Sequence, residues 1–396
     1  MVSIQLSERV QRIKPSATLA VTNRAKELRA TGKDVIGLGA GEPDFDTPDH
    51  IKEAAIQAIR DGFTKYTAVD GTPGLKKAVV DKFARDNGLD FAPDQVLVSV
   101  GGKHSIFNLA MALLNDGDEM IVPAPYWVSY PDIALLAGAR PVIVDTSMEQ
   151  GFKMTPGQLE AAITPRTRLL MLNSPSNPTG KAYTRAELAG LGEVLRRHEQ
   201  VLIATDDMYE HIMWTDEPFS NIVMACPDLL ERSIVLNGVS KAYSMTGWRI
   251  GYAAGPKALI GAMRKIQSQS TSNPTSIAQV AAEAALNGDQ GCIAPMVKAF
   301  KERHDRVVER LNRIKGVSCL PADGTFYAFP SFQGAQDTLG AKDDVELAER
   351  ILNEVGVALV PGSAFGAPGF QRLSFATSMQ NLDGALDRIE GMLGTD

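Results

Sequence analysis

The hydrophobic positions of the chain fall into short runs that end in polar or turn-forming residues. Seven of these runs lie in the middle of the sequence, at Val96–Val100, Glu119–Pro123, Arg140–Asp145, Leu169–Ser174, Val201–Asp206, Ser233–Asn237 and Ile250–Ala254. Most are rich in Val, Ile and Leu without clean alternation, which is typical of strands buried on both faces. Helical patterns lie between several of them, for example over Ile106–Leu114 and Arg185–His198. The pattern predicts an α/β fold with a doubly wound, mainly parallel, seven-stranded sheet.

The pattern changes near residue 300. An amphipathic helix over Ala294–Arg313 is expected to lead out of the sheet. Beyond it, and near the N-terminus, the predicted elements are strands at Thr325–Pro330, Val355–Pro361 and Arg372–Thr377 and helices at Asp344–Val355, Gln380–Leu393 and Ser16–Thr31. We therefore expect a large domain over residues 47–300 and a smaller α+β domain built from residues 1–46 and 301–396.

Composition narrows the class of function. Hydrophobic residues make up 44% of the 396 positions and charged residues 22%, as in an ordinary globular protein. The net charge is -7 and basic residues form no dense block, which argues against a nucleic-acid partner. No segment has the apolar run of a signal peptide or a membrane span, so we expect a cytoplasmic protein without a membrane partner. Small-molecule chemistry is the favoured function.

Metal and disulfide chemistry find no support in the sequence. The three cysteines, Cys226, Cys292 and Cys319, are widely spaced and form no CxxC motif. The five histidines are scattered without the spacing of paired metal ligands. We therefore expect no metal site.

The end of the run Ser233–Asn237 carries an unusual set of polar groups. The Lys241 amine can condense with an aldehyde, and Ser240, the backbone around Gly238 and Arg249 can bind a phosphate dianion. Pyridoxal 5'-phosphate has both an aldehyde and a phosphate. This segment therefore predicts a pyridoxal-phosphate site.

Two other predicted strands end in residues that this cofactor needs. Ligands bind beyond the carboxyl ends of strands in open α/β sheets. Asp206 would pair with the pyridinium nitrogen, and Asn177 and Tyr209 could hydrogen-bond the ring phenolate. Each residue taken alone also has a structural interpretation, as a helix N-cap, a turn residue and a packing aromatic, respectively.

A two-glycine turn offers a place for the phosphate. Backbone N–H groups of Gly101, Gly102 and Lys103 would face an anion at the N-terminus of a helix expected to begin near Ser105. A sharp corner is the alternative for this turn. Trp127, taken alone, would be interpreted as a core tryptophan.

Together these motifs resemble those of the class I aminotransferases, which are fold-type I pyridoxal-phosphate enzymes. The similar segments are SKAYSMTGWRIGY from Ser240, the NPTG turn from Asn177 and the acidic-x-x-Tyr turn at Asp206. The resemblance extends from KPSAT at Lys14 to RLSFATS at Arg372. It implies the fold-type I fold, the cofactor, and ping-pong transamination in which Lys241 moves the α-proton of the substrate.

The resemblance also implies further cofactor contacts. Trp127 would stack on the cofactor ring, and the turn at Gly101 would hold the phosphate. Tyr66 would reach the phosphate of the neighbouring subunit, which implies a homodimer with shared active sites. Taken alone, Tyr66 would be interpreted as a loop anchor.

For the substrate, the resemblance implies that Arg372 forks onto the α-carboxylate beside Gly41, with Trp127 and Asn177 close to the substrate as well. The arginine on an apolar strand could instead form a structural salt bridge. The loop Gly39–Phe45 could instead be a hinge between domains, and both roles are compatible.

The subgroup that the chain most resembles contains aspartate and bifunctional aspartate/prephenate aminotransferases. The resemblance implies that Lys103, and Ser16 from the partner chain, bind the distal carboxylate; a solvated charge and a helix N-cap are the alternatives. We find no equivalent, around Ser270–Pro274, of the partner arginine that other aspartate aminotransferases use. The expected reaction is L-aspartate plus 2-oxoglutarate to oxaloacetate plus L-glutamate. Aromatic, prephenate or broad-specificity transamination and β-elimination remain alternatives.

Overall fold

Seven strands form the central sheet in the computed structural model, which describes residues 4–395. They are β2 (Val96–Ser99), β3 (Glu119–Ala124), β4 (Arg140–Asp145), β5 (Thr167–Asn173), β6 (Leu202–Asp206), β7 (Ser233–Gly238) and β8 (Gly251–Ala254). Their order in the sheet is β2-β8-β7-β6-β5-β3-β4, and β8 runs in the direction opposite to the other six strands. All seven predicted strands are confirmed, with ends within two residues of those expected.

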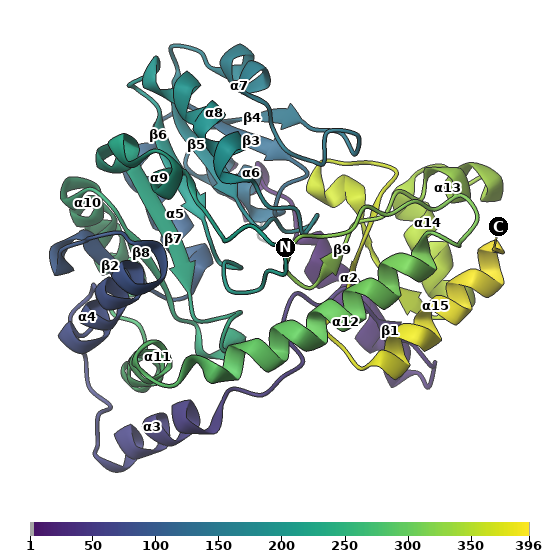
Figure 1. Ribbon diagram of the computed structural model, residues 1–396, viewed down its shortest axis with the longest axis horizontal. Helices are drawn as coiled ribbons and strands as arrows, with labels where there is room; N and C mark the ends of the chain where they lie inside the picture. The colour runs from purple at the N-terminus through teal and green to yellow at the C-terminus, as the bar shows by residue number, and fades with distance from the viewer. Residues whose placement is uncertain (1–3, 396) are drawn as a thin grey trace.

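Helices cover both faces of this sheet, as Figure 1 shows. One face packs on α5 (Gly102–Leu113), α6 (Ser129–Leu136) and α10 (Lys257–Ser268). The other packs on α4 (Pro73–Lys82), α7 (Pro156–Ala162), α8 (Arg185–Arg196), α9 (Ile222–Ala225) and α11 (Ser276–Asn287), with α3 (Asp49–Arg60) against α11. Along β2, Leu97 packs on the first face and Val96 and Val98 on the second. Strands buried on both faces have no polar side, so the predicted doubly wound arrangement is confirmed.

Two small sheets form the core of the other part of the molecule. Strand β1 (Ile36–Gly37) pairs in parallel with β10 (Val357–Ala358), and β11 (Val360–Pro361), β12 (Gln371–Ser374) and β9 (Tyr327–Ala328) form an antiparallel sheet. Around them lie α2 (Ala17–Ala30), α12 (Ile293–Leu311), α13 (Gln333–Leu339), α14 (Asp344–Arg350) and α15 (Met379–Leu393).

The predicted strands in this region are too long. The expected strand from Thr325 is reduced to β9, because Thr325 has a φ of 69°, outside the range of a strand. The strand expected from Val355 is two strands that pair with different partners. It begins later as well, because Val355 ends a π-helical turn that closes at Gly356, where φ is 69°.

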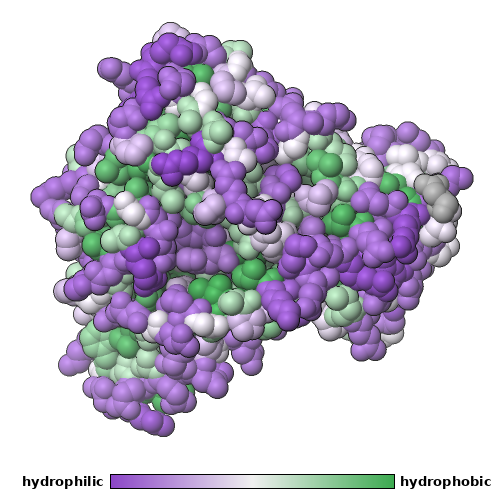
Figure 2. All heavy atoms as spheres, in the orientation of Figure 1, coloured by the Kyte–Doolittle hydropathy of each residue, from purple (hydrophilic) through white to green (hydrophobic). Residues whose placement is uncertain are grey.

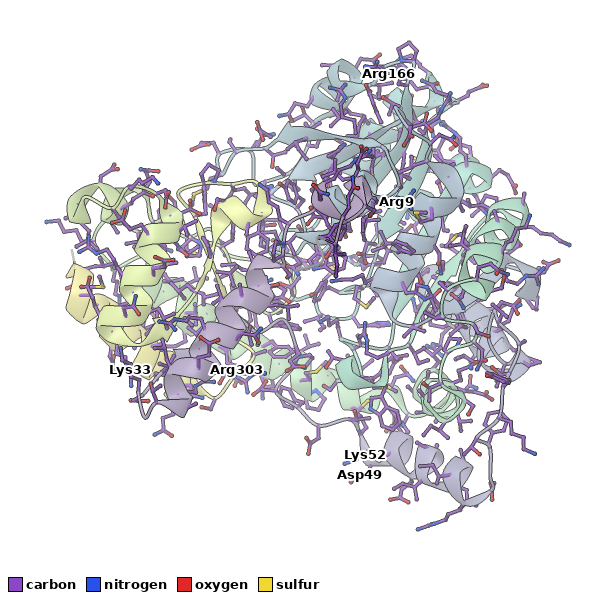
Figure 3. All side chains as sticks on the ribbon, turned by 180° about the vertical axis from the view of Figure 1, so that it is seen from behind. Arg9, Lys33, Asp49, Lys52, Arg166 and Arg303 are labelled. Atoms are coloured by element: carbon purple, nitrogen blue, oxygen red, sulfur yellow. The ribbon has the colours of Figure 1, made fainter. Side chains whose placement is uncertain are left out.

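Helix α12 joins the two parts and runs diagonally between them in Figure 1. Its buried side chains include Met296, Phe300 and Val307, which belong to the core around the small sheets. The N-terminal segment also contacts both parts. Helix α1 (Glu8–Gln11), which carries Arg9 in Figure 3, lies against α6, whereas α2 packs on β10 and β11.

The outer surface is mixed in character. Figure 2 shows hydrophobic side chains in small groups among hydrophilic ones on one face of the molecule. Within residues 4–395, no helix has both the length and the apolar character needed to cross a bilayer.

Candidate active site

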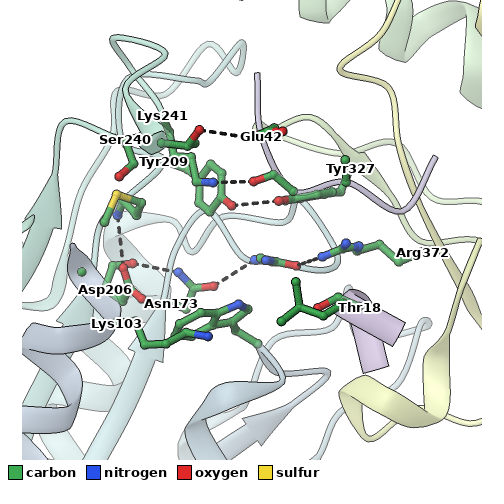
Figure 4. A pocket seen from close by; sticks show the side chains of 18 of the residues that line it. Thr18, Glu42, Lys103, Asn173, Asp206, Tyr209, Ser240, Lys241, Tyr327 and Arg372 are labelled. Atoms are coloured by element: carbon green, nitrogen blue, oxygen red, sulfur yellow. Dashed lines mark hydrogen bonds between the residues drawn. The ribbon is translucent and has the colours of Figure 1, made fainter. Parts of the chain in front are cut away.

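The carboxyl ends of β5, β6 and β7 border one cleft with a volume of about 520 Å³. Parallel pairing sets Asn173 beside Asp206 and Asp206 beside Leu236, so the segments that follow these strands meet at one edge of the sheet. Of the residues expected from the sequence, those that line the cleft are Gly41, Gly102, Lys103, Trp127, Asn177, Asp206, Tyr209, Ser240, Lys241, Arg249 and Arg372. Figure 4 shows several of them converging from separate elements.

Lys241 follows β7 and points into the cleft. Its Nζ donates a hydrogen bond to the backbone oxygen of Gly41 at 2.5 Å. Burial lowers the pKa of Lys241 to about 8, and the charges of Arg372 and Arg249 act in the same direction, while Glu42 opposes them. A larger fraction of this amine is therefore neutral near pH 8 than in an ordinary lysine, and the neutral form is the nucleophile and base.

Asp206 ends β6 and is held by a partner that the sequence did not reveal. The Tyr130 hydroxyl donates to its carboxylate at 2.6 Å, and both side chains are buried. Burial raises the pKa of Asp206 to about 6, against the effects of the Tyr130 hydrogen bond and the Lys241 charge. Asn173 Nδ2 donates to the Asp206 backbone oxygen at 2.9 Å, and Asn173 Oδ1 accepts from the Asn177 N–H at 2.9 Å. Asn173 therefore fixes the turns that carry two of the expected residues.

Arg372 on β12 is 2% exposed and lies at the opposite wall. Its guanidinium donates to Asn177 Oδ1 at 2.9 Å and to the Gly39 backbone oxygen at 2.8 Å, and its buried Nε has no hydrogen-bond partner. No carboxylate of the described residues pairs with it, so the alternative of a structural salt bridge fails. Because a buried charge is costly unless it is paired, an anionic ligand at Arg372 would supply the counter-charge that the described residues lack.

The glycine turn lies beside Arg249. Gly101 has a φ of 82°, and a Cβ there would lie 2.3 Å from Arg249 Nη2, so only glycine fits. Helix α5 begins at Gly102 and not near Ser105 as expected, because Gly101 itself turns the chain into the helix. The first N–H groups of α5 have no partner within the helix and lie at the cleft. Arg249 is fixed by a hydrogen bond to the Thr246 backbone oxygen at 2.8 Å.

Three of the expected cofactor residues do not line the cleft in the single chain, namely Gly101, Gly238 and Tyr66. Gly238 is buried under β8, where a Cβ would lie 3.0 Å from the Ile250 backbone oxygen, so close packing explains this glycine. Tyr66 lies on the loop between α3 and α4 and is 92% exposed.

The residues expected at the distal carboxylate lie on two elements. Lys103 Nζ is 5.0 Å from the centre of the Trp127 ring, and burial together with the Arg249 charge lowers the pKa of Lys103. Ser16 is the N-cap residue of α2 and its hydroxyl lies 2.9 Å from that of Thr18, which lines the cleft. Helix α2 of the same chain thus borders the cleft through residues that follow Ser16. The contribution of Ser16 from the partner chain stays a prediction.

Several cleft residues escaped the sequence analysis. They are Thr18, Leu19, Thr22 and Lys26 of α2, together with Glu42, Tyr130, Asn173 and Tyr327. The spacing of Thr18, Thr22 and Lys26 by four residues would have placed them on one helix face. Tyr130 lies three residues after Trp127. Neither the spacing on α2 nor the position of Tyr130 shows by itself that these side chains point into a site.

The composition of the cleft suits anionic ligands. Five basic side chains line it, namely Lys26, Lys103, Lys241, Arg249 and Arg372, against two acidic ones, Glu42 and Asp206. The glycine cradle beside Arg249 fits a phosphate, since a Cβ at Gly101 would fill it. The donors and the carboxylate are therefore those that a phosphorylated cationic ring with an aldehyde needs.

Comparison with known proteins establishes the family. Residues 33–389 match the family described as aminotransferase class I and II, and the chain belongs to it. Enzymes of this family transfer amino groups between amino acids and oxo acids.

Similar proteins and structures agree with this assignment. A protein of Nitrosomonas europaea named aspartate/prephenate aminotransferase is 60% identical over 98% of this chain and 100% of its own length. An aspartate aminotransferase of Geobacillus stearothermophilus is 51% identical over 98% of each chain. The structure of the Rhizobium meliloti aspartate aminotransferase is 47% identical, with a TM-score of 0.94 over 98% of each chain. The Thermus thermophilus aspartate aminotransferase with maleate is 44% identical, with a TM-score of 0.93 over 99% of this chain and 100% of that one.

Proposed function

We propose that the chain is a pyridoxal-phosphate-dependent aminotransferase that takes the amino group of L-aspartate and passes it to 2-oxoglutarate. The observation that carries the proposal is the buried, unpaired guanidinium of Arg372 in the same cleft as the Lys241 amine. An amino acid supplies the carboxylate that Arg372 lacks and brings its α-carbon between the two groups. The names of the similar proteins support aspartate as the donor.

The residues present fit the cofactor. Lys241 would bind it covalently, and Asp206 would pair with the ring nitrogen. Ser240, Arg249 and the N-terminus of α5 would hold the phosphate. When bound, the cofactor supplies a cationic ring that withdraws electrons from the α-carbon of the substrate.

The other contacts to the ring come from three side chains. Trp127 would stack on the face of the ring, and Tyr209 and Asn177 would hydrogen-bond its oxygen. Asn177 also accepts from Arg372, so one amide side chain would touch both the cofactor and the residue that binds the α-carboxylate.

Lys241 is the proton carrier in this proposal. A lysine with a pKa of about 8 can take up a proton from the α-carbon and release it again near neutral pH. Gly41 accepts a hydrogen bond from the same Nζ, and Arg372 orients the substrate from the opposite wall. These positions favour transfer of a proton over a short path within the cleft.

The distal carboxylate of the donor would bind to Lys103, with Ser16 and Thr18 at the start of α2 close by. Lys103 has no acidic partner among the described residues and lies beside the Trp127 ring. With Lys241 bound to the cofactor and Arg249 at its phosphate, Lys26, Lys103 and Arg372 would remain as cations for a dicarboxylate. A second candidate is combined aspartate and prephenate transamination, which the name of the Nitrosomonas europaea protein favours.

We further propose a homodimer. Tyr66 is 92% exposed, and Phe63 and Ile59 nearby are 41% and 53% exposed. A second copy of the chain would cover this apolar group and bring Tyr66 to the phosphate of the neighbouring cleft. Sedimentation of the purified protein tests the dimer, and a monomer that is fully active would contradict it.

The domain division and the compartment are also proposals. Separate hydrophobic clusters around the large sheet and around the small sheets support domains at residues 47–300 and at 1–46 with 301–396. The small domain would close over the substrate and exclude water. We propose the cytoplasm as the compartment on the strength of the sequence.

A half-reaction tests the proposed activity. L-aspartate alone is added to the purified holoenzyme while the absorbance of the bound cofactor is followed, and 2-oxoglutarate is added afterwards. We expect aspartate to bleach the absorbance and the oxo acid to restore it. Bleaching by phenylalanine but not by aspartate would mean that the amino donor is an aromatic amino acid and not aspartate. Steady release of ammonia without an acceptor would indicate an eliminating enzyme.

A further inference from the structure

Tyr327 is a fully buried tyrosine between two residues of the candidate active site. It lies on β9, and its neighbour across the sheet is Ser374, two residues beyond Arg372 on β12. Its hydroxyl is 3.0 Å from that of Tyr209, and the Arg372 guanidinium is centred 4.5 Å from its ring. Figure 4 shows Tyr327 between the other two. It therefore touches the residue expected at the cofactor and the one expected at the substrate carboxylate.

The hydroxyl contact decides where the Tyr209 proton points. Either oxygen of this pair can donate, and each hydroxyl has a single proton. Tyr209 can donate to a ligand in the cleft while it keeps this contact only when Tyr327 is the donor between the two. When Tyr327 is the donor of this pair, its hydroxyl leaves the Tyr209 proton free to point toward the cleft.

The ring contact holds Arg372. Tyr327 and Phe365 face the guanidinium at 4.5 and 5.0 Å, while Asn177 accepts from its edge. An arginine between aromatic faces keeps its position without a carboxylate partner. The ring of Tyr327 thus helps keep the guanidinium ready for an anion.

Charge links the two contacts. Burial raises the pKa of both hydroxyls, and the Arg372 charge acts against that rise in both. The other ionisable groups that face the pair among the described residues are Asp206 beside Tyr209, Glu42 beside Tyr327, and Lys241, whose Nζ lies 5.8 Å from the centre of the Tyr209 ring. An anion on Arg372 would remove the opposing charge, so both hydroxyls would hold their protons more tightly and donate more weakly.

We propose that Tyr327 is a positioning residue that couples Arg372 to Tyr209, so that binding of a substrate carboxylate changes how strongly Tyr209 donates to the cofactor. The inference rests on the proposed function, because it requires a cofactor bound at Lys241 and Tyr209. In this proposal the two parts of the Tyr327 side chain have different roles. The hydroxyl acts on Tyr209 and the ring acts on Arg372.

The first test is a pH titration of the absorbance of the holoenzyme. A hydrogen bond from Tyr209 to the ring oxygen favours the deprotonated form of the Lys241-bound cofactor, so losing its orientation raises the midpoint. We expect Tyr327→Phe to raise the midpoint by about 0.3–1 pH unit. The double variant with Tyr209→Phe should match Tyr209→Phe alone. A wild-type midpoint in Tyr327→Phe, or additive shifts in the double variant, would overturn the inference.

The second test adds succinate, a dicarboxylate that has no amino group to transfer. In the wild type we expect succinate to raise the midpoint, because its charge favours the protonated form. In Tyr327→Phe this rise should be smaller, since the link to Tyr209 is lost. An equal rise in the two proteins would overturn the coupling.

The third test separates the ring from the hydroxyl. Tyr327→Leu removes the aromatic face, and we expect succinate to bind about 2- to 30-fold more weakly. Tyr327→Phe keeps the face and should bind succinate within about twofold of the wild type. Equal weakening in both variants would contradict the division of roles.

Tyr183→Phe is the matched control. Tyr183 is a partly buried tyrosine outside the cleft, and its hydroxyl accepts from the Met154 N–H at 2.7 Å. We expect this control to keep the wild-type midpoint, and an equal shift would mean that loss of any buried hydroxyl is sufficient. A wild-type protein that binds no cofactor would overturn the proposed function as well, whereas the outcomes above overturn the coupling alone.

Discussion

The Tyr130 hydroxyl donates a hydrogen bond to the Asp206 carboxylate at 2.6 Å within a buried part of the cleft. Tyr130 lies on α6, which packs on the large sheet, and Asp206 lies at the end of β6, a strand of that sheet. The bond stabilises the ionised carboxylate. Burial has the opposite effect and raises the pKa of Asp206 to about 6. Asp206 therefore loses its charge as the pH falls through about 6.

Tyr130→Phe should weaken cofactor binding, most strongly at low pH. Without the hydroxyl the pKa of Asp206 rises further, so the carboxylate is protonated at a pH where the wild type is ionised. We expect the dissociation constant of pyridoxal 5'-phosphate at pH 6.5 to rise by roughly 3- to 10-fold, with a smaller effect at pH 8.5. Equilibrium dialysis across this range measures it. An effect of the same size at every pH would mean that the hydroxyl does not act through the ionisation of Asp206.

Lys241→Ala should abolish multiple-turnover transamination and leave cofactor binding in place. In the proposed function the variant lacks the amine that would move the proton, while Asp206, Ser240 and Arg249 would still hold the ring and phosphate. Cofactor content after gel filtration and the rate with aspartate and 2-oxoglutarate are the two measurements. Substantial turnover in this variant would rule out Lys241 as the proton carrier.

Lys103→Ala should lower kcat/KM for aspartate far more than kcat/KM for phenylalanine or alanine. Loss of one charge-assisted contact to a carboxylate costs about 1.5–3 kcal/mol, or about 10- to 150-fold in kcat/KM for aspartate. Phenylalanine and alanine have no distal carboxylate and should change little. An equal loss for all three donors would show that Lys103 acts on the cofactor or on the fold.

Lys82→Met should destabilise the fold. Lys82 forms a buried ion pair with Glu210, whose carboxylate also accepts from Asn87 at 2.7 Å. Removing the cation leaves a buried carboxylate without its counter-charge, which costs about 3–5 kcal/mol. Urea denaturation at pH 7 gives the free energy of unfolding. Lys77→Met is the control, because its pair with Asp81 is exposed and we expect a loss of at most about 0.5 kcal/mol.

The sequence was most informative where the chemistry follows directly after a strand. Strands without alternation had to be buried on both faces, and a mainly parallel sheet brings its carboxyl ends to one edge. Asn177, Asp206 and Lys241 could therefore be assigned to one site before any coordinates. The short strands of the smaller region could not be bounded in this way. Their ends depend on positive φ values at Thr325 and Gly356, which the hydrophobic pattern does not reveal.

The sequence by itself determined the seven strands of the large sheet and the residues at their ends, because burial on both faces and motif order are properties of local sequence. Which side chains surround those residues depends on how distant segments pack together. Tyr130 meets Asp206 across 76 positions of the chain, and Tyr209 meets Tyr327 across 118. The orientation of the polar face of α2 cannot be read from its sequence. Packing of α2 on β10 and β11 places this face toward the cleft. Such contacts depend on how distant elements pack, and no local pattern encodes them.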